Sequence, residues 1–142
     1  MNLNPDFIEK LRNSGLRPTK QRLKICEVLF NTEKTFHFTI NDLSKIIIEK
    51  LNEKISLATV YNTVYAFKKK GYLKEISING DKSYFDTNTS IHHHFYDEDT
   101  RELIDCETAD IDPININKNI TGKKINSVEV LIRVASDNQN QN

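Results

Sequence analysis

Three consecutive histidines, His92, His93 and His94, are the feature of this 142-residue chain that most directly suggests chemistry. Side chains alternate between the two faces of a β-strand, so His92 and His94 would point to the same side. Two imidazoles on one face are a ready pair of metal ligands, and a histidine tract inside a chain is compositionally a metal-binding candidate. We therefore expect a metal site around this tract.

Two carboxylates and a fourth histidine could complete such a site. Asp86 ends a predicted strand, and Asp105 lies in the apolar, strand-like run 102–106. Fe(II), Mn(II) and Zn(II) accept mixed imidazole and carboxylate ligands. His37, the only histidine of the first half, would join the cluster if it folds onto it. Alternatively, His37 is an ordinary surface residue in a loop.

The first half of the chain has the pattern of helices followed by a hairpin. Apolar spacing predicts helices within 5–15, 20–30, 40–51 and 57–70. Thr19, Thr39 and Ser56 are suited to cap the last three at their N-termini, and Gly71 to end the fourth. Alternation over 72–78 and 82–85 around Asn79-Gly80-Asp81 predicts a β-hairpin. Helices closed by a hairpin form a winged helix-turn-helix, which we assign to residues 1–85.

A winged helix places its last helix in the major groove of double-stranded DNA. The residues expected to contact bases or phosphates on that helix are Thr59, Tyr61, Asn62 and Tyr65. Further phosphate contacts are expected from the basic residues Arg17, Arg22, Lys68 and Lys82. The lysines at 68–70 could instead simply complement the helix dipole. The two tyrosines could be core aromatics, although Val60, Val64 and Phe67 already fill the inward face.

The second half predicts a small domain over residues 86–136. Residues 97–101 are expected to form a polar hairpin turn, and the alternation over 128–135 predicts a final strand. The segment 112–126 is poorly periodic and supports no prediction, and 137–142 is expected to be a disordered tail. The predicted fold class is α+β, a winged helix-turn-helix followed by a small α/β domain.

Charge and cysteine content narrow the functional classes. Residues 1–85 carry 15 Lys and Arg against 9 Asp and Glu, whereas residues 86–142 carry 5 against 11. A basic half joined to an acidic one fits a nucleic-acid reader with a second module. Cys26 and Cys106 belong to no C-x-x-C pair, so a reduced compartment is expected. No basic leader and no apolar stretch of about 18 residues occurs, so we expect a cytoplasmic protein without a membrane span.

Several of these motifs together resemble the ferric uptake regulator family of metal-dependent repressors. The likeness runs from about residue 11 to about residue 135. Its specific parts are Gly15-Leu16-Arg17-Pro18-Thr19-Lys20-Gln21-Arg22, Leu57-Ala58-Thr59-Val60-Tyr61 and the histidine tract. The resemblance implies a homodimer paired through the second domain. It also implies DNA contact by Tyr61 and approach to the minor groove near Arg17.

The resemblance also implies a regulatory metal site with five ligands. In this chain the matching positions are His37, Asp86, His92, His94 and Asp105. Acids at both carboxylate positions make the set similar to that of the peroxide-sensing branch. Three departures from the family pattern qualify this likeness.

The first departure is that Asp97 and Thr100 replace a cysteine pair and the second pair is absent, so we expect no structural zinc. The second is that Ile91 stands where a histidine is usual, which leaves His93 and Asp112 as an incomplete pair at a further family site. The third is that the helix usual between the second-domain strands looks shortened.

Because it has a histidine triplet without those cysteines, the chain most resembles the haem-responsive iron response regulator branch of the family. Cys26 is followed by Glu27, so the Cys-Pro haem motif of some members of that branch is absent. If haem binds, the resemblance implies an axial imidazole from His92, His93 or His94.

The expected function is an iron-responsive transcriptional regulator, not an enzyme. It would bind operator DNA as a homodimer, with an affinity set by a divalent metal (Fe, Mn or Zn) or by haem. A peroxide sensor or another metal sensor of the same family is the alternative. Other classes are a metallohydrolase using His92, His94 and Asp105, for which no general base is left over, and a zinc-binding module.

Overall fold

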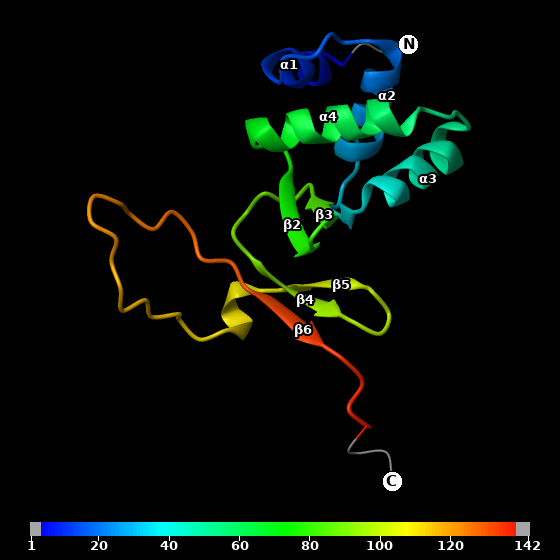
Figure 1. Ribbon diagram of the computed structural model, residues 1–142. Coiled ribbons are helices and arrows are strands. Elements are labelled where there is room, and N and C mark those ends of the chain that lie inside the picture. The colour runs from blue at the N-terminus through cyan, green and yellow to red at the C-terminus, as the bar shows by residue number, and fades with distance from the viewer. Residues whose placement is uncertain (1–3, 139–142) are drawn as a thin grey trace. The chain divides into compact units, whose positions relative to one another are not determined.

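The computed structural model describes residues 4–138, and its contacts divide the chain between Thr89 and Ser90 into two compact units (Figure 1). The first is mainly helical, and the second is built on a small sheet. This combination confirms the α+β class. None of the helices in residues 4–138 combines the length and apolar character that a bilayer crossing requires. The expected disordered tail lies mostly outside the described residues.

Four helices of the first unit begin and end where the local signals predict. They are α1 (Pro5–Asn13), α2 (Lys20–Phe30), α3 (Ile40–Leu51) and α4 (Leu57–Lys70). The side chains of Thr19, Thr39 and Ser56 each accept a backbone N–H bond at the start of α2, α3 and α4. Thr39 and Asp42 form a reciprocal capping box. Gly71 ends α4 with φ 91°, a conformation that favours glycine.

A three-stranded sheet closes the first unit. The hairpin predicted after Gly71 is present as β2 (Lys74–Asn79) and β3 (Lys82–Asp86), joined by a tight turn. A short strand, β1 (His37–Phe38), pairs with the other edge of β3, so the sheet order is β1-β3-β2. The sequence pattern did not predict β1, because two residues are too few to establish an alternation.

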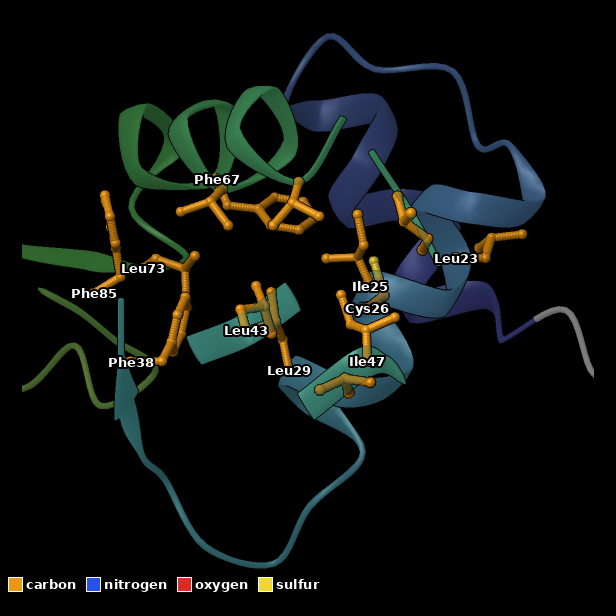
Figure 2. Packing of buried hydrophobic residues seen from close by; sticks show 14 of the residues in the cluster. Leu23, Ile25, Cys26, Leu29, Phe38, Leu43, Ile47, Phe67, Leu73 and Phe85 are labelled. Atoms are coloured by element: carbon orange, nitrogen blue, oxygen red, sulfur yellow. The ribbon is translucent and has the colours of Figure 1, made fainter. Parts of the chain in front are cut away.

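The core of the first unit lies where α2, α3 and α4 meet the sheet. Figure 2 shows Leu29, Leu43, Ile47 and Phe67 turned toward one interior, with Phe85 of β3 at its sheet end. All five side chains are buried. The burial of Val60, Val64 and Phe67 fixes the rotation of α4, so the helix face opposite the core is the one that can carry binding residues.

The second unit is a sheet of three short strands with a long irregular segment. The antiparallel pair β4 (His93–Asp97) and β5 (Leu103–Cys106) is joined by the expected polar turn, and β6 (Leu131–Val134) runs parallel to β4. The sheet order is β5-β4-β6. β4 is therefore the central strand, and it carries His93 and His94 of the histidine tract.

Two features of the second unit differ from expectation. The final strand was predicted over 128–135, but only Leu131–Val134 forms β6, because a strand needs a hydrogen-bonded neighbour as well as alternation. Helical structure after β5 is limited, within the described residues, to the single turn η1 (Thr108–Asp110). The chain between η1 and β6 runs out from the sheet as a wide loop (Figure 1).

Candidate metal centre and nucleic-acid interface

The second unit brings two of the three tract histidines and one acid to a single point. The Nε2 atoms of His92 and His94 lie 3.6 and 3.3 Å from Oδ1 of Asp105. Their ring centroids are 4.4 Å apart, as expected for two residues on one face of a strand. Asp105 is opposite His94 in the β4–β5 register. The group therefore presents two imidazoles and one carboxylate within reach of one ion.

The hydrogen bond of His92 sets its protonation in a way that suits a ligand. His92 Nδ1 lies 2.8 Å from the carbonyl oxygen of Ser90. A carbonyl oxygen only accepts, so Nδ1 carries the proton and neutral His92 has its lone pair on Nε2, toward Asp105. A lone pair that faces a carboxylate 3.6 Å away is an arrangement that a metal ion between them would stabilise. A carbonyl that fixes the tautomer in this way is typical of metal-bound histidines.

His93 has the opposite arrangement. Its Nδ1 accepts a bond from the backbone N–H of Val130 at 2.9 Å, so neutral His93 carries its proton on Nε2. The ring is buried, with 6% of its surface exposed, on the other face of β4. A ring with both nitrogens occupied in this way is a poor ligand for a metal or for haem iron. His93 instead joins β4 to the chain just before β6.

His37 and Asp86 are neighbours within the first unit. They are register partners on β1 and β3, and Lys74 of β2 faces Asp86 from the other side. Asp86 Oδ1 also accepts the backbone N–H of Asn88 at 2.8 Å. Burial lowers the pKa of Lys74, and the negative charge of Asp86 opposes that shift only in part. The first unit thus presents one imidazole and one carboxylate side by side at the end of its sheet.

The outer face of α4 carries the residues expected to meet DNA. Tyr61 is 48% exposed and Asn62 is exposed, whereas Thr59 and Tyr65 are half-buried. The Tyr61 and Tyr65 rings stack with centroids 4.3 Å apart and planes 29° from parallel. Leu57 adds an exposed apolar side chain at the start of the helix. This face offers hydroxyl, amide and apolar groups, which are the types that read base edges in the major groove.

Arg17, Arg22 and Thr59 line one open cavity beside α4. Its volume is about 650 Å³, and Thr19, Lys20 and Gln21 complete its wall. Arg22 Nη1 donates to the carbonyl oxygen of Arg17 at 3.0 Å, so the two basic residues are held together. Because the cavity combines two guanidinium groups with the start of α2, it suits an anionic group such as a DNA phosphate.

The two lysines expected to contact phosphates, Lys68 and Lys82, differ in their surroundings. Lys68 Nζ lies 3.2 Å from Oε1 of Glu75, so this lysine is already paired with an acid of the hairpin. Lys82 opens β3, where it is half-buried. Sequence reasoning missed Glu75, since its partners lie on a different element and no spacing rule links them.

Both cysteines are buried and apart from the histidine cluster's ligand atoms. Burial raises the pKa of the Cys26 thiol to about 12, with the positive charge of Lys10 opposing it. Burial also raises the pKa of the Cys106 thiol, and the negative charges of Asp110 and Glu107 raise it further. Both thiols are therefore protonated at neutral pH in the metal-free protein.

Comparison with known proteins agrees with these features. The chain matches the ferric uptake regulator family over residues 13–133. It is 32% identical over 121 residues to the peroxide operon regulator of Bacillus subtilis, covering 84% of this chain and 81% of that protein. It is 42% identical over 89 residues to the ferric uptake regulation protein of Yersinia pestis, covering 63% of this chain and 58% of that protein.

A solved structure supports the same assignment. The ferric uptake regulator of Vibrio cholerae aligns with a TM-score of 0.68 and 26% identity, over 91% of this chain and 98% of that chain. This likeness confirms the expected architecture of a winged helix followed by a dimerisation domain. The chain belongs to the ferric uptake regulator family of metal-responsive transcriptional regulators and is not an enzyme.

Proposed function

We propose that this protein is an iron-responsive regulator that binds a pseudo-palindromic operator as a homodimer, with its DNA affinity set by a divalent metal. The observation that carries the proposal is the convergence of His92 Nε2, His94 Nε2 and Asp105 Oδ1 on one point. Two histidines and one carboxylate with open positions form a ligand set that suits Fe(II). Mn(II) and Zn(II) are the competing ions.

The crowding of ligand atoms around His92 Nε2 favours a single metal ion over haem. Haem iron takes axial ligands on either side of a flat macrocycle, so an imidazole and a carboxylate beside the same nitrogen would obstruct it. Three ligand atoms within 4.8 Å of one another instead fit around a single ion. His93, the third haem candidate, already accepts the Val130 N–H at Nδ1. We therefore propose a metal ion as the ligand, and the experiment below includes haem as the competing ligand.

His37 and Asp86 are proposed to complete the coordination. They stand side by side on β1 and β3, and only five residues separate Asp86 from His92 along the chain. Ligands from both units would make the relative pose of the units depend on metal occupancy. The winged helices would then match the two half-site positions of the operator only in one state.

The exposed apolar side chains of the second unit support the homodimer. Four isoleucines of the loop before β6 are exposed: Ile114, Ile116, Ile120 and Ile125. Four large exposed apolar side chains in one segment are more than isolated surface hydrophobics, and we propose that a partner covers them. A second copy of the same unit is the partner that operator symmetry requires.

The test is a titration of DNA binding with each ligand. Fluorescence anisotropy of a duplex from the promoter of its own coding sequence would be measured with Fe(II) under anaerobic conditions, Mn(II), Zn(II) and haem. We expect a divalent metal to change the dissociation constant at least about tenfold, which corresponds to about 1.4 kcal/mol of coupling.

The ligand assignment is tested with two matched variants. The double variant His92→Ala and His94→Ala should remove the metal response, whereas His93→Asn should retain it. The absence of DNA binding under every metal and haem condition would refute the function. A response only to haem would refute the metal assignment.

A further inference from the structure

Glu75 is an acidic side chain on the surface that the proposed function assigns to DNA. It lies on β2 of the wing, opposite Phe85 of β3, and its side chain is 21% exposed. Both of its carboxylate oxygens contact side chains of α4. Tyr65 Oη donates to Oε2 at 3.3 Å, and Lys68 Nζ lies 3.2 Å from Oε1. An acid here opposes phosphate binding in general.

The contact with Tyr65 restrains the ring on which Tyr61 rests. Tyr65 is held at its hydroxyl by Glu75, and its ring packs edge-on against the buried Phe85, with centroids 5.3 Å apart. Tyr61 stacks on the outer side of Tyr65 at 4.3 Å. Glu75, Tyr65 and Tyr61 therefore form a continuous chain of contacts from the wing to the most exposed aromatic ring of α4.

The protonation states keep this chain of contacts intact at neutral pH. Burial raises the pKa of Tyr65 to about 12, and the bond to Tyr61 and the charge of Glu75 add to the shift, so its hydroxyl keeps the proton that it donates. Burial would raise the pKa of Glu75, but bonds from the side chains of Ser83 and Lys68 outweigh burial and lower it. Glu75 is thus a carboxylate.

The contact with Lys68 has a second effect. Lys68 is the first of three consecutive lysines at the end of α4, and it is paired with Glu75. A paired lysine releases fewer counterions on binding a phosphate, which weakens attraction to any DNA regardless of sequence. Glu75 therefore weakens the sequence-independent part of binding while it orders the group that reads bases.

We propose that Glu75 is a positioning residue that determines specificity: by holding Tyr65 and Lys68 it fixes Tyr61 for base reading and lowers affinity for unrelated DNA. The inference rests on the proposed function, because it presumes that the outer face of α4 meets an operator. The chemistry that Tyr61 can recognise is an apolar base edge, such as a thymine methyl group.

Glu75→Ala tests the proposal, with Asp81→Ala as the matched control. Asp81 lies in the exposed turn of the same hairpin and lines the same cavity of about 620 Å³ as Tyr61, Tyr65 and Glu75. Removing either acid takes one negative charge from this surface and should strengthen binding to a scrambled duplex. Only Glu75→Ala should also weaken operator binding, and its operator-to-scrambled affinity ratio should fall about tenfold.

The measurement is fluorescence anisotropy with the full-length, Mn(II)-loaded protein. The two probes are the promoter duplex that the wild-type protein binds and a scrambled duplex of equal composition. Tyr65→Phe keeps the ring and removes the hydroxyl, so it should lower the ratio as well. The double variant Tyr65→Phe with Glu75→Ala should lose less than the sum of the two single losses.

Each result bears on the proposal in a defined way. Equal ratios for Glu75→Ala and Asp81→Ala, or additive losses in the double variant, would overturn it while leaving the proposed function intact. A wild-type protein that fails to distinguish the two duplexes would overturn both. A loss of stability alone would lower the fraction of active protein for both probes and leave the ratio unchanged.

Discussion

The backbone N–H of Val130 donates to Nδ1 of His93 at 2.9 Å, and this bond ties the central strand β4 to the chain that enters β6. His93→Ala would leave that N–H without its partner in a partly buried setting. We expect a loss of about 1 kcal/mol in the free energy of unfolding, measured by urea denaturation. His93→Asn offers an amide oxygen near the position of Nδ1 and should recover part of the loss.

The His93→Asn variant also tests whether His93 stabilises the fold without binding the metal. Metal affinity of His93→Asn, measured by titration, should stay within about threefold of wild type, since its ring is on the face of β4 away from Asp105. A loss of metal affinity comparable to that of His92→Ala would contradict the assignment of the two tautomers.

Local sequence signals were sufficient to predict the helices and the hairpin of the first unit. Each of these signals depends on a few adjacent residues. They are the helix caps at Thr19, Thr39 and Ser56, the left-handed Gly71 and the tight hairpin turn. Signals of this kind are complete within the sequence, so the four helices and the wing were predicted close to their observed bounds.

Features that depend on distant partners were not predictable in the same way. The strand β6 is shorter than its alternation predicted, because the length of a strand depends on its neighbour. Three adjacent histidines look alike in sequence, yet Ser90 and Val130 give His92 and His93 opposite tautomers. The contact between Tyr65 and Glu75 joins a helix to a strand, and no periodicity encodes it.

Thiol chemistry provides a second prediction. Cys26 and Cys106 are the only cysteines of the chain, and burial raises the pKa of each. We expect neither to react with a disulfide reagent within minutes in the folded protein at about pH 8, because the thiolate is the reactive form. Both should react at once in denaturant.

Replacing both cysteines tests whether either of them helps the protein to bind zinc. A double substitution, Cys26→Ala with Cys106→Ala, should leave the zinc content of the purified protein unchanged. Rapid labelling of either thiol in the folded state, or a loss of zinc from the double variant, would show that a cysteine does serve as a ligand.

The capping box of α3 gives a third prediction. Thr39 Oγ1 accepts the Asp42 N–H, and an Asp42 carboxylate oxygen accepts the Thr39 N–H, each at 3.1 Å. Thr39→Ala should lower the free energy of unfolding by about 1 kcal/mol in urea denaturation. Thr89→Ala, at an exposed position outside the helices and strands, should change it by less than about 0.5 kcal/mol. Equal effects of the two substitutions would exclude a stabilising role for the box.

The carboxylate of Glu75 should also give a measurable pH dependence of stability. The pKa of Glu75 in the folded protein is lowered, because bonds from Ser83 and Lys68 outweigh the opposing effect of burial. A group with a depressed folded pKa stabilises the protein above its unfolded pKa, and this contribution is lost as the pH falls through the folded value. The wild-type protein should therefore exceed Glu75→Gln in stability at about pH 7, by about 1 kcal/mol.

The difference should close on acidification. Urea denaturation at about pH 7 and at a pH below the folded pKa of Glu75 compares the two proteins where Glu75 is ionised and where it is protonated. Asp81→Asn removes an equal charge from the same hairpin without the contacts to Tyr65 and Lys68, so it separates the local bonds from the general effect of net charge. If the gap between wild type and Glu75→Gln were the same at both pH values, the fold would stabilise the ionised and neutral forms of Glu75 equally, and the contacts of Tyr65 and Lys68 would not favour the carboxylate.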